Sequence, residues 1–371
     1  MIYTRLSSLV LDSSLLSIKD TPIVCISHKE DVDGIASAAL LKAAFGNVSV
    51  ILVDYANIIS TLEKINLETS SSSSPASTKN FRGKKMPKIF ICDLGLNKKN
   101  EQRFMDILSK SISKGYNVTY IDHHDLSEHA SEGLIEMGVN LIHSIRECTS
   151  VQVYSKFKRR LKPDAAFYAA AGALTDYLEN GPRGSSLITK FDRQFLMLES
   201  SVLSYMISSK QHDNKFLGTI VDSLSSMKYP HEMEGGFSIA EKYAKKIVNG
   251  MNAIKKLIVE TKEVAYVQGS AELSAAATVN FVLGASDRHV AMVYKLKDDI
   301  NSCVISIRGS KGCKVHLGRL VNDISSNMGG SGGGHDKAAG AVIPKENLME
   351  FIEMLDRSVS DFAHSQHKDK R

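Results

Sequence analysis

The chain has 371 residues, more than one ordinary domain core holds, so two domains are expected. Hydrophobic residues make up 43% and charged residues 23%, the balance of a soluble globular protein, and no apolar run approaches the roughly 20 residues of a membrane span. The net charge of +5 is compatible with a polyanionic ligand but is too small to identify one.

The cysteines and the N-terminal residues indicate a compartment. Residues 1–20 mix leucine, serine and charges without the basic, apolar and small-residue order of a secretory signal. The five cysteines are widely spaced and include no C-x-x-C pair: Cys25, Cys92, Cys148, Cys303 and Cys313. This pattern favours free thiols in a reducing cytoplasm over a disulfide framework or a zinc site. We therefore expect a cytoplasmic protein without a membrane segment.

The first half of the chain alternates short apolar runs with helical patterns. It predicts strands over residues 23–27, 48–54, 89–93 and 118–122, and helices over 35–45 and 97–113. The apolar runs are continuous, which indicates strands buried on both faces, as in a parallel sheet covered by helices. A serine-rich stretch over 69–88 interrupts this order and is predicted to be a flexible surface insertion.

The pattern becomes mainly helical after Thr149, and residues 164–178 are apolar almost all round, which predicts a buried helix. A second α/β unit is predicted further on, with strands over 264–267, 289–294, 304–308 and 338–343, and a helix over 316–328. The fold class is therefore α/β, and the predicted parts are a parallel-sheet domain over 1–207, a helical connector over 208–261 and a smaller α/β domain over 262–371.

Acidic residues and histidines gather in four segments, three of which directly follow predicted strands. In chain order these residues are His28, Glu30, Asp31 and Asp33, then Asp93, then Asp122, His123 and His124, and finally Asp176 on the apolar helix. Because the carboxyl ends of parallel strands share one edge of a sheet, we expect these groups to converge. So many carboxylates in one crevice would repel one another unless divalent cations compensate their charge.

A pair of cations roughly 3.5–4 Å apart can activate water, neutralise phosphoryl oxygens and stabilise a leaving oxygen. Carboxylates mixed with imidazoles, without thiolates, suit Mn²⁺ better than structural zinc. Taken singly, each segment also fits a turn, a surface histidine pair or a buried Asp bonded to backbone amides. The combination with Asp176, which would be costly on an apolar helix without charge compensation, indicates a metal-dependent hydrolase.

Three features outside these segments are compatible with phosphate binding. The glycine run from Gly329 to Gly340 allows backbone amides to approach a phosphate, and His335 adds a donor, although a flexible hairpin is the structural alternative. Arg308 ends a predicted strand and suits bidentate oxyanion binding, although a surface salt bridge is its commoner role. The basic stretch 156–162 is interpreted as a solvated face, with a nucleic-acid contact as the alternative.

The motifs D-x-D-G, D-x-G and D-H-H with a later Asp, together with the segment GGSGGGHDKAAGA, resemble those of the DHH phosphoesterases and their DHH-associated C-terminal domain. The resemblance covers about residues 21–180 and 262–345, and the motifs are most similar to those of compact archaeal RecJ-like proteins. It implies an active site in the cleft between two domains. It also implies two Mn²⁺ ions, for which Mg²⁺ or Co²⁺ would substitute.

The resemblance implies a role for each residue. One metal ion would be bound by His28, Asp31 and Asp93, and the other by Asp33, Asp93, His123 and Asp176, with Asp93 shared. Asp122 and His124 would orient these ligands or face the phosphate. The terminal nucleotide would be held by Arg308, Gly332, Gly333, Gly334 and His335. Two residues separate His28 from Asp31, where relatives have one or three, so Glu30 is an alternative ligand to His28.

The expected activity is that of a single-strand-specific exonuclease acting on DNA or RNA ends. The nearest alternative is a hydrolase of very short substrates, such as an oligoribonuclease or a phosphatase of 3′-phosphoadenosine 5′-phosphate, because no added all-β segment is predicted. A replisome scaffold is a third alternative, but scaffold relatives lose metal ligands and every candidate carboxylate is retained here. The expected partners are single-stranded nucleic acid or short oligonucleotides, and replication or repair proteins for a scaffold.

Overall fold

The computed structural model describes residues 23–71, 88–96, 100–270 and 273–368. The chain divides into two compact units, residues 1–243 (unit 1) and 244–371 (unit 2). The division falls within helix α10 (Gly236–Lys255), inside the segment predicted as a connector. Within the described residues, no helix combines the length and the apolar character required to cross a membrane.

Unit 1 contains a five-stranded parallel sheet in the order β2-β1-β3-β4-β5. Its strands are β1 (Ile23–His28), β2 (Ser49–Val53), β3 (Lys88–Cys92), β4 (Asn117–Asp122) and β5 (Asn140–His143). The first four confirm the strands predicted from the apolar runs. The fifth was not predicted, because it is a four-residue edge strand without a buried residue and so lacks a continuous apolar run.

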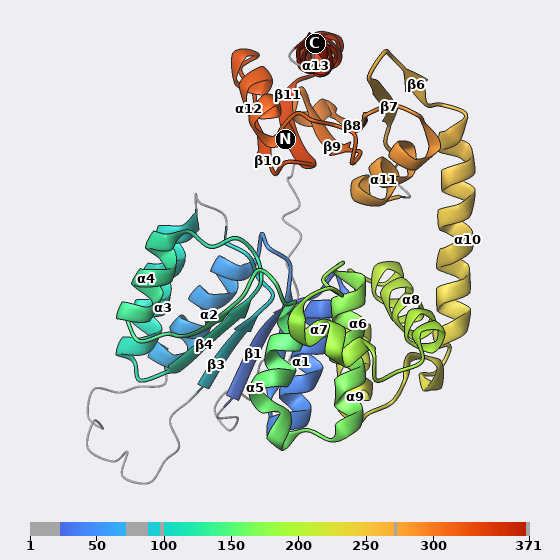
Figure 1. Ribbon diagram of the computed structural model, residues 1–371. Helices are drawn as coiled ribbons and strands as arrows, with labels where there is room; N and C mark the ends of the chain where they lie inside the picture. Colours follow the sequence, from blue (N-terminus) through green and yellow to red (C-terminus); the bar gives the residue numbers. More distant parts are fainter. Residues whose placement is uncertain (1–22, 72–87, 97–99, 271–272, 369–371) are drawn as a thin grey trace, which may run out of the picture. The chain divides into compact units, whose positions relative to one another are not determined.

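Helices cover both faces of this sheet, as Figure 1 shows. On one face, Cys25, Phe90 and Ile121 pack with helices α1 (Val32–Phe45), α5 (Thr149–Phe157), α6 (Ala166–Thr175), α8 (Arg193–Ser209) and α9 (Asn214–Ser225). On the other face, Ile26, Ile91 and Tyr120 pack with α2 (Ile58–Ser71), α3 (Glu101–Ser113) and α4 (Glu128–Glu136). Alternate strand residues thus serve two cores, which accounts for the unbroken apolar runs.

Three stretches of unit 1 differ from the prediction or lie beyond it. The helix predicted over 164–178 ends at Thr175, so Asp176 caps it. Helix α9 packs on α1 and so belongs to unit 1, although it lies in the segment predicted as a helical connector over 208–261. Most of the insertion predicted over 69–88 lies outside the described residues, as do residues 1–20 and 97–99. Residues 69–71 end α2. Helix α7 (Pro182–Ile188) completes the unit.

Unit 2 is built on a six-stranded sheet in the order β10-β11-β9-β8-β7-β6, in which only β7 and β8 run parallel. The strands are β6 (Val259–Glu260), β7 (Val264–Gln268), β8 (Val290–Lys297), β9 (Ser302–Gly309), β10 (Ser331–Gly334) and β11 (Ala338–Pro344). Helices α12 (Leu317–Asn327) and α13 (Leu348–Lys368) cover one face and α11 (Ala275–Ala285) the other.

Part of the glycine run in unit 2 forms strand β10, which pairs antiparallel with β11, so the run is part of a hairpin, the structural alternative considered for it. Helix α12 approaches this hairpin closely. A Cβ added at Gly318 of α12 would lie 2.1 Å from the carbonyl oxygen of Gly334. A Cβ added at Gly332 would lie 2.6 Å from Oγ of Ser325. Small residues on both elements are therefore required by packing inside the unit.

Candidate metal centre

The carboxyl ends of three neighbouring strands bring the predicted acidic segments of unit 1 together. His28 ends β1, Asp93 directly follows β3, and Asp122 ends β4 just before His123. Asp31 caps α1, where its Oδ1 accepts a hydrogen bond from the amide of Gly34 at 2.9 Å. The geometry therefore agrees with the convergence expected at one edge of a parallel sheet.

Four of the predicted metal ligands form one tight group. Asp33, Asp93, His123 and Asp176 each offer an atom, and these atoms all lie within 4.8 Å of one another. Nε2 of His123 is 3.2 Å from Oδ1 of Asp93, 3.3 Å from Oδ2 of Asp176 and 3.9 Å from Oδ2 of Asp33. We call this group the four-residue cluster. It is the set that the family resemblance implied for one metal ion.

Two helices hold Asp33 in place. Its side chain is completely buried, Oδ2 accepts the amide N–H of Thr149 at 2.7 Å, and Oδ1 accepts that of Ser150 at 2.8 Å. Both amides belong to the first turn of α5, where the helix dipole favours a negative charge. A Cβ added at Gly172 of α6 would lie 2.7 Å from Oδ1 of Asp33. The carboxylate is therefore fixed from two sides.

Asp93 has an oxygen that the protein leaves without a partner. Oδ1 accepts a hydrogen bond from Oγ1 of Thr149 at 3.2 Å, but Oδ2 is buried and has no hydrogen-bond partner among the described residues. Its backbone φ of 57° lies in the left-handed region, which few residues other than glycine adopt. Burial, and then the carboxylates of Asp31 and Asp33, raise the pKa of Asp93 well above its usual range. A bound cation would give Oδ2 a partner and would compensate the repulsion between these carboxylates.

The pKa shifts of Asp176 and His123 also fit a bound cation. Burial, followed by the nearby charges of Asp33 and Asp31, raises the pKa of Asp176 to about 10. Burial lowers the pKa of His123, against the opposing effect of Asp33. A neutral imidazole is the form that binds metals, and a divalent ion would replace the proton that crowding otherwise forces onto a carboxylate. The donor set therefore fits a divalent cation.

Asp122 and Tyr55 fix the ring of His124. Oδ1 of Asp122 is 3.0 Å from Nδ1 of His124, and Oη of Tyr55 is 3.0 Å from Nε2. Although burial disfavours the charged ring, the hydrogen bond and the charge of Asp122 outweigh it and raise the pKa of His124. His124 also forms a second close group with Asp93 and His123, whose ligand atoms lie within 4.8 Å of one another.

The remaining predicted ligands, His28 and Asp31, form a pair beside the four-residue cluster. Nε2 of His28 lies 3.3 Å from Oδ2 of Asp31, and Nδ1 is buried without a hydrogen-bond partner. Among the described residues, these two side chains do not form a group within 4.8 Å with Asp93. Glu30, the alternative to His28, is exposed.

Several contributing residues were not predicted. Tyr55 stacks on His28 with ring centroids 4.3 Å apart and also holds His124, while Thr149, Ser150 and Gly172 fix Asp33 and Asp93. Tyr55 follows strand β2 by two residues. The position after a strand end, which identified the acidic segments, would also have identified this tyrosine.

The predicted substrate residues lie together at one end of unit 2. Arg308 on β9 is opposite Ala338 on β11, and the amide of His335 donates to the carbonyl of Ala338 at 2.7 Å. Burial lowers the pKa of the half-buried Arg308, and its Nη1 donates to the carbonyl of Ile307 at 3.0 Å. An added Cβ at Gly333 would meet no atom within 4 Å, so this backbone is open to approach.

Comparison with known families matches both halves of the chain. Residues 22–178 match the "DHH family, N-terminal domain", and residues 262–361 match the "DHHA1 domain". Together these matches cover well over half of the sequence. The chain belongs to the DHH family of phosphoesterases. Its class is therefore that of the metal-dependent phosphoesterases, hydrolases of ester bonds.

Solved structures with the same fold include three with TM-scores above 0.5. A pGpG-specific phosphodiesterase, PggH of Vibrio cholerae, is 11% identical, with 91% of this chain and 99% of that one covered and a TM-score of 0.54. A DHH domain described as a member of the s1p family of ribosomal proteins is 13% identical, with 91% and 86% covered and a TM-score of 0.62. RecJ of Thermus thermophilus with Mn²⁺ is 12% identical, with 91% and 52% covered and a TM-score of 0.56. No curated protein matches significantly.

Proposed function

We propose that this chain is a two-metal phosphodiesterase that removes nucleotides from the ends of single-stranded DNA or RNA, with Mn²⁺ as its preferred ion. The observation that carries the proposal is the four-residue cluster, whose four ligand atoms lie within 4.8 Å of one another. Mixed carboxylate and imidazole donors suit Mn²⁺. The Mn²⁺ in the RecJ structure supports a divalent cation at this site.

We assign one ion to the four-residue cluster. We assign the second to Asp93 together with His28 and Asp31, because the unpartnered Oδ2 of Asp93 and Nδ1 of His28 are both buried. His28 is preferred to Glu30, whose side chain is exposed. When bound, the two ions supply positive charge for the phosphoryl oxygens and acidify the attacking water.

Asp122 and His124 are proposed to act on the phosphate. The carboxylate of Asp122 lies 3.0 Å from Nδ1 of His124, and this contact stabilises the ring when it carries a proton at both nitrogens. The charged ring can then donate a hydrogen bond from Nε2 to a phosphate oxygen, with Tyr55 at 3.0 Å from that atom in the free protein.

In unit 2, Arg308 and the segment from Gly332 to His335 are proposed to bind the terminal nucleotide of the substrate. Close packing inside the unit is enough to account for glycine at positions 332 and 334. The support for nucleotide binding therefore comes from Gly333 and from the guanidinium of Arg308. Gly333 leaves its backbone accessible, and a guanidinium provides paired donors that match phosphate oxygens.

The test is an assay with labelled substrates. Purified protein is incubated with Mn²⁺, Mg²⁺ or Co²⁺ and with single-stranded DNA or RNA labelled at either end, alongside duplexes. We expect mononucleotide release from single strands that requires the cation. Asp176→Asn should lower the rate by at least about a thousandfold, while the exposed Asp164→Asn, with the same charge change, should retain it. Undiminished turnover by Asp176→Asn would refute the site.

Hydrolysis of very short substrates is the second candidate. The match covers 99% of the pGpG-specific phosphodiesterase but only 52% of RecJ, so this chain has the extent of the former. The two candidates differ in how the rate depends on length. A dinucleotide cleaved faster than a strand of about 12 nucleotides would favour the short-substrate enzyme, and the reverse order would favour the exonuclease.

A further inference from the structure

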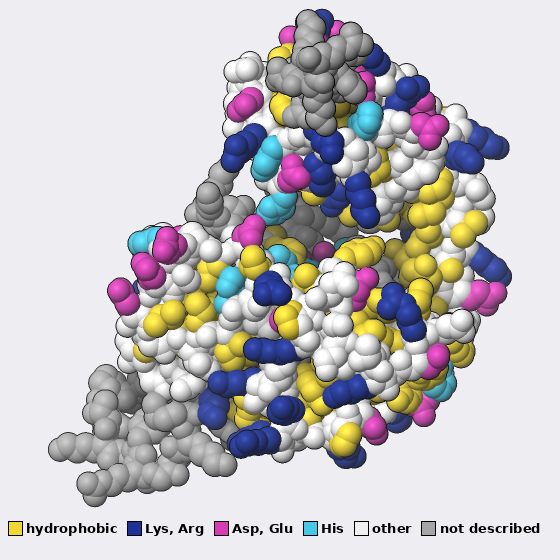
Figure 2. Space-filling view, viewed as in Figure 1, with side chains coloured by type: hydrophobic (Ala, Val, Ile, Leu, Met, Phe, Trp, Pro, Cys, Tyr) yellow, Lys and Arg dark blue, Asp and Glu magenta, His cyan; other side chains and the backbone are white. Residues whose placement is uncertain are grey.

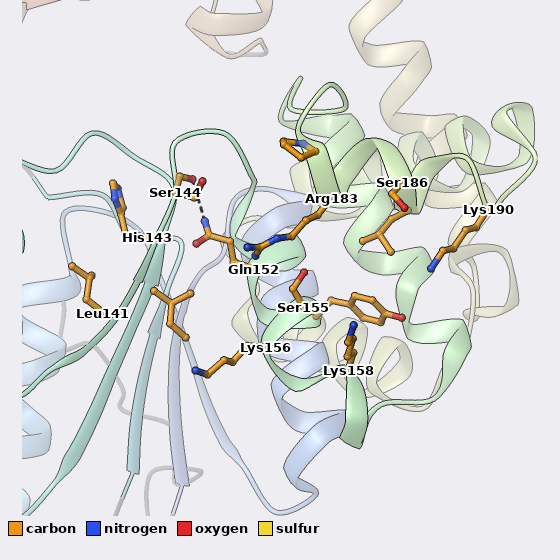
Figure 3. A pocket seen from close by; sticks show the side chains of 14 residues that line it. Leu141, His143, Ser144, Gln152, Ser155, Lys156, Lys158, Arg183, Ser186 and Lys190 are labelled. Atoms are coloured by element: carbon orange, nitrogen blue, oxygen red, sulfur yellow. Dashed lines mark hydrogen bonds between the residues drawn. The ribbon is translucent and has the colours of Figure 1, made fainter.

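A basic groove lies within unit 1, between strand β5 and helices α5 and α7. It encloses about 830 Å³ and is open to solvent. Four of its lining residues are cationic: Lys156, Lys158, Arg183 and Lys190. Among the residues that the structure describes, no aspartate or glutamate lines it. Figure 3 shows Arg183 and Lys190 pointing from α7 and its end back toward α5, and Lys156 pointing toward the sheet.

No described residue forms an ion pair that would neutralise the positive charge of this groove. All four cationic side chains are exposed, and no ion pair involving them occurs among the described residues. On the face of unit 1 seen in Figure 2, Lys and Arg side chains gather over the region of α5 and α7. Like charges concentrated in a concave surface attract and hold a polyanion.

The wall of the groove is hydrogen-bonded to the backbone of the metal centre. Nε2 of Gln152, which lines the groove, donates to the carbonyl oxygens of Asp122 at 3.0 Å and Ser144 at 3.2 Å. Nε2 of His143, also in the lining, is 2.6 Å from the carbonyl oxygen of His124. The groove wall is thus bonded to two residues of the D-H-H motif.

Glu147 fixes the start of the helix that carries Arg183. The buried Glu147 accepts the amide N–H of Arg183 at 2.6 Å and that of Gly184 at 3.0 Å, which fixes the first turn of α7. Lys156 and Lys158 belong to the basic stretch interpreted from the sequence as a solvated face. The fold brings them to the same groove as Arg183 and Lys190, which no sequence pattern linked to them.

We propose that this groove binds the phosphodiester backbone of the substrate strand, beyond the nucleotides that occupy the metal centre. This inference rests on the proposed function, and it names where the rest of the strand is held. A nucleic-acid backbone presents one negative charge per nucleotide. Such a row of charges matches cations spread over α5, α7 and the residues just after each helix better than a single phosphate does.

The test uses a quadruple variant, Lys156→Gln, Lys158→Gln, Arg183→Gln and Lys190→Gln. A matched control carries the same charge change at exposed unit 1 residues outside the groove, by Arg193→Gln, Lys210→Gln, Lys215→Gln and Lys228→Gln. A third variant keeps the groove charged and carries Lys156→Arg, Lys158→Arg, Arg183→Lys and Lys190→Arg. Thermal melting of each variant verifies folding.

Binding is measured with a labelled single strand of about 12 nucleotides in Ca²⁺, over a range of salt concentrations. We expect the groove variant to bind at least about tenfold more weakly, with the slope of log K against log salt reduced by up to about 3. The control and the charge-retaining variant should bind like the wild type. The rate at which the groove variant hydrolyses a dinucleotide, which is too short to reach the groove, should stay within about twofold of the wild-type rate.

Two results would overturn the proposal: wild-type binding by the groove variant, or an equal loss in the control. If no substrate is hydrolysed by the wild type but the groove variant still loses strand binding, the proposed activity fails while the groove assignment stands. If hydrolysis occurs normally and binding is independent of the groove, only the groove assignment fails.

Discussion

The raised pKa of Asp176 makes the stability of the metal-free protein depend on pH. Its pKa is raised to about 10 by burial and by Asp33 and Asp31, whereas an unfolded chain has a value near about 4. The folded, metal-free protein therefore holds a proton that the unfolded chain releases. Stability from this group is full below about pH 4 and is lost as pH rises toward 10, because the folded state binds more protons in that range.

We accordingly predict that the metal-free protein loses stability between about pH 5.5 and 9, by at most about 1.4 kcal/mol per pH unit from this residue. The change Asp176→Asn removes the titrating group, so the free energy of unfolding of the variant should fall less steeply with pH, by up to about 1.4 kcal/mol per pH unit. Urea unfolding in a chelator at several pH values measures the difference. Parallel curves for the wild type and the variant would contradict the prediction.

Tyr55 gives a second test at the scale of one side chain. The change Tyr55→Phe keeps the stacking on His28 and removes the hydrogen bond to His124, so we predict a loss of activity of about three- to tenfold. Tyr55→Ala removes both contacts and should also weaken Mn²⁺ binding. Turnover rates and calorimetric metal titrations separate the two effects. Equal metal affinity in all three proteins would argue against a role of the stacking.

Among the elements, α6 reaches the centre because residue 172 has no side chain. A Cβ at this position would lie 2.2 Å from Oγ of Ser150 and 2.7 Å from Oδ1 of Asp33. We predict that Gly172→Ala costs about 1–3 kcal/mol of stability and lowers metal affinity. In α9, a Cβ at Gly218 would meet no atom within 4 Å, so Gly218→Ala should be neutral or stabilise by up to about 1 kcal/mol. Denaturation and Mn²⁺ titration of both variants provide the comparison.

Elements that bury continuous apolar runs could be predicted from the sequence, and so could the acidic segments at their ends. Strand β5 could not, because an edge strand makes few apolar contacts. The packing of α9 on α1 could not either, because it is a tertiary contact of a segment predicted only as a helical connector. The clustering of Asp33 with His123 followed from strand order, but the anchoring of Asp33 by α5 depended on contacts 116 and 117 residues apart. Such contacts leave no local pattern.

For the whole molecule, the two compact units predict a selective response to metal. The four-residue cluster lies in unit 1, so saturating Mn²⁺ should stabilise that unit by about 2.7 kcal/mol at a hundred times the dissociation constant. We expect scanning calorimetry to show one unfolding transition that rises with Mn²⁺ and one that does not. Chelation should reverse the rise, and Asp176→Asn should abolish it. A uniform shift of all transitions would contradict this assignment.

Helix α5 begins at the amides that hold Asp33 and ends near Lys156 and Lys158 in the basic groove, nine residues later. At 1.5 Å per residue it spans about 13 Å, which is roughly the length of four stacked nucleotides. A strand that extends fewer than about four nucleotides from the metal centre would not reach these lysines. Affinity should therefore rise once the strand exceeds that length.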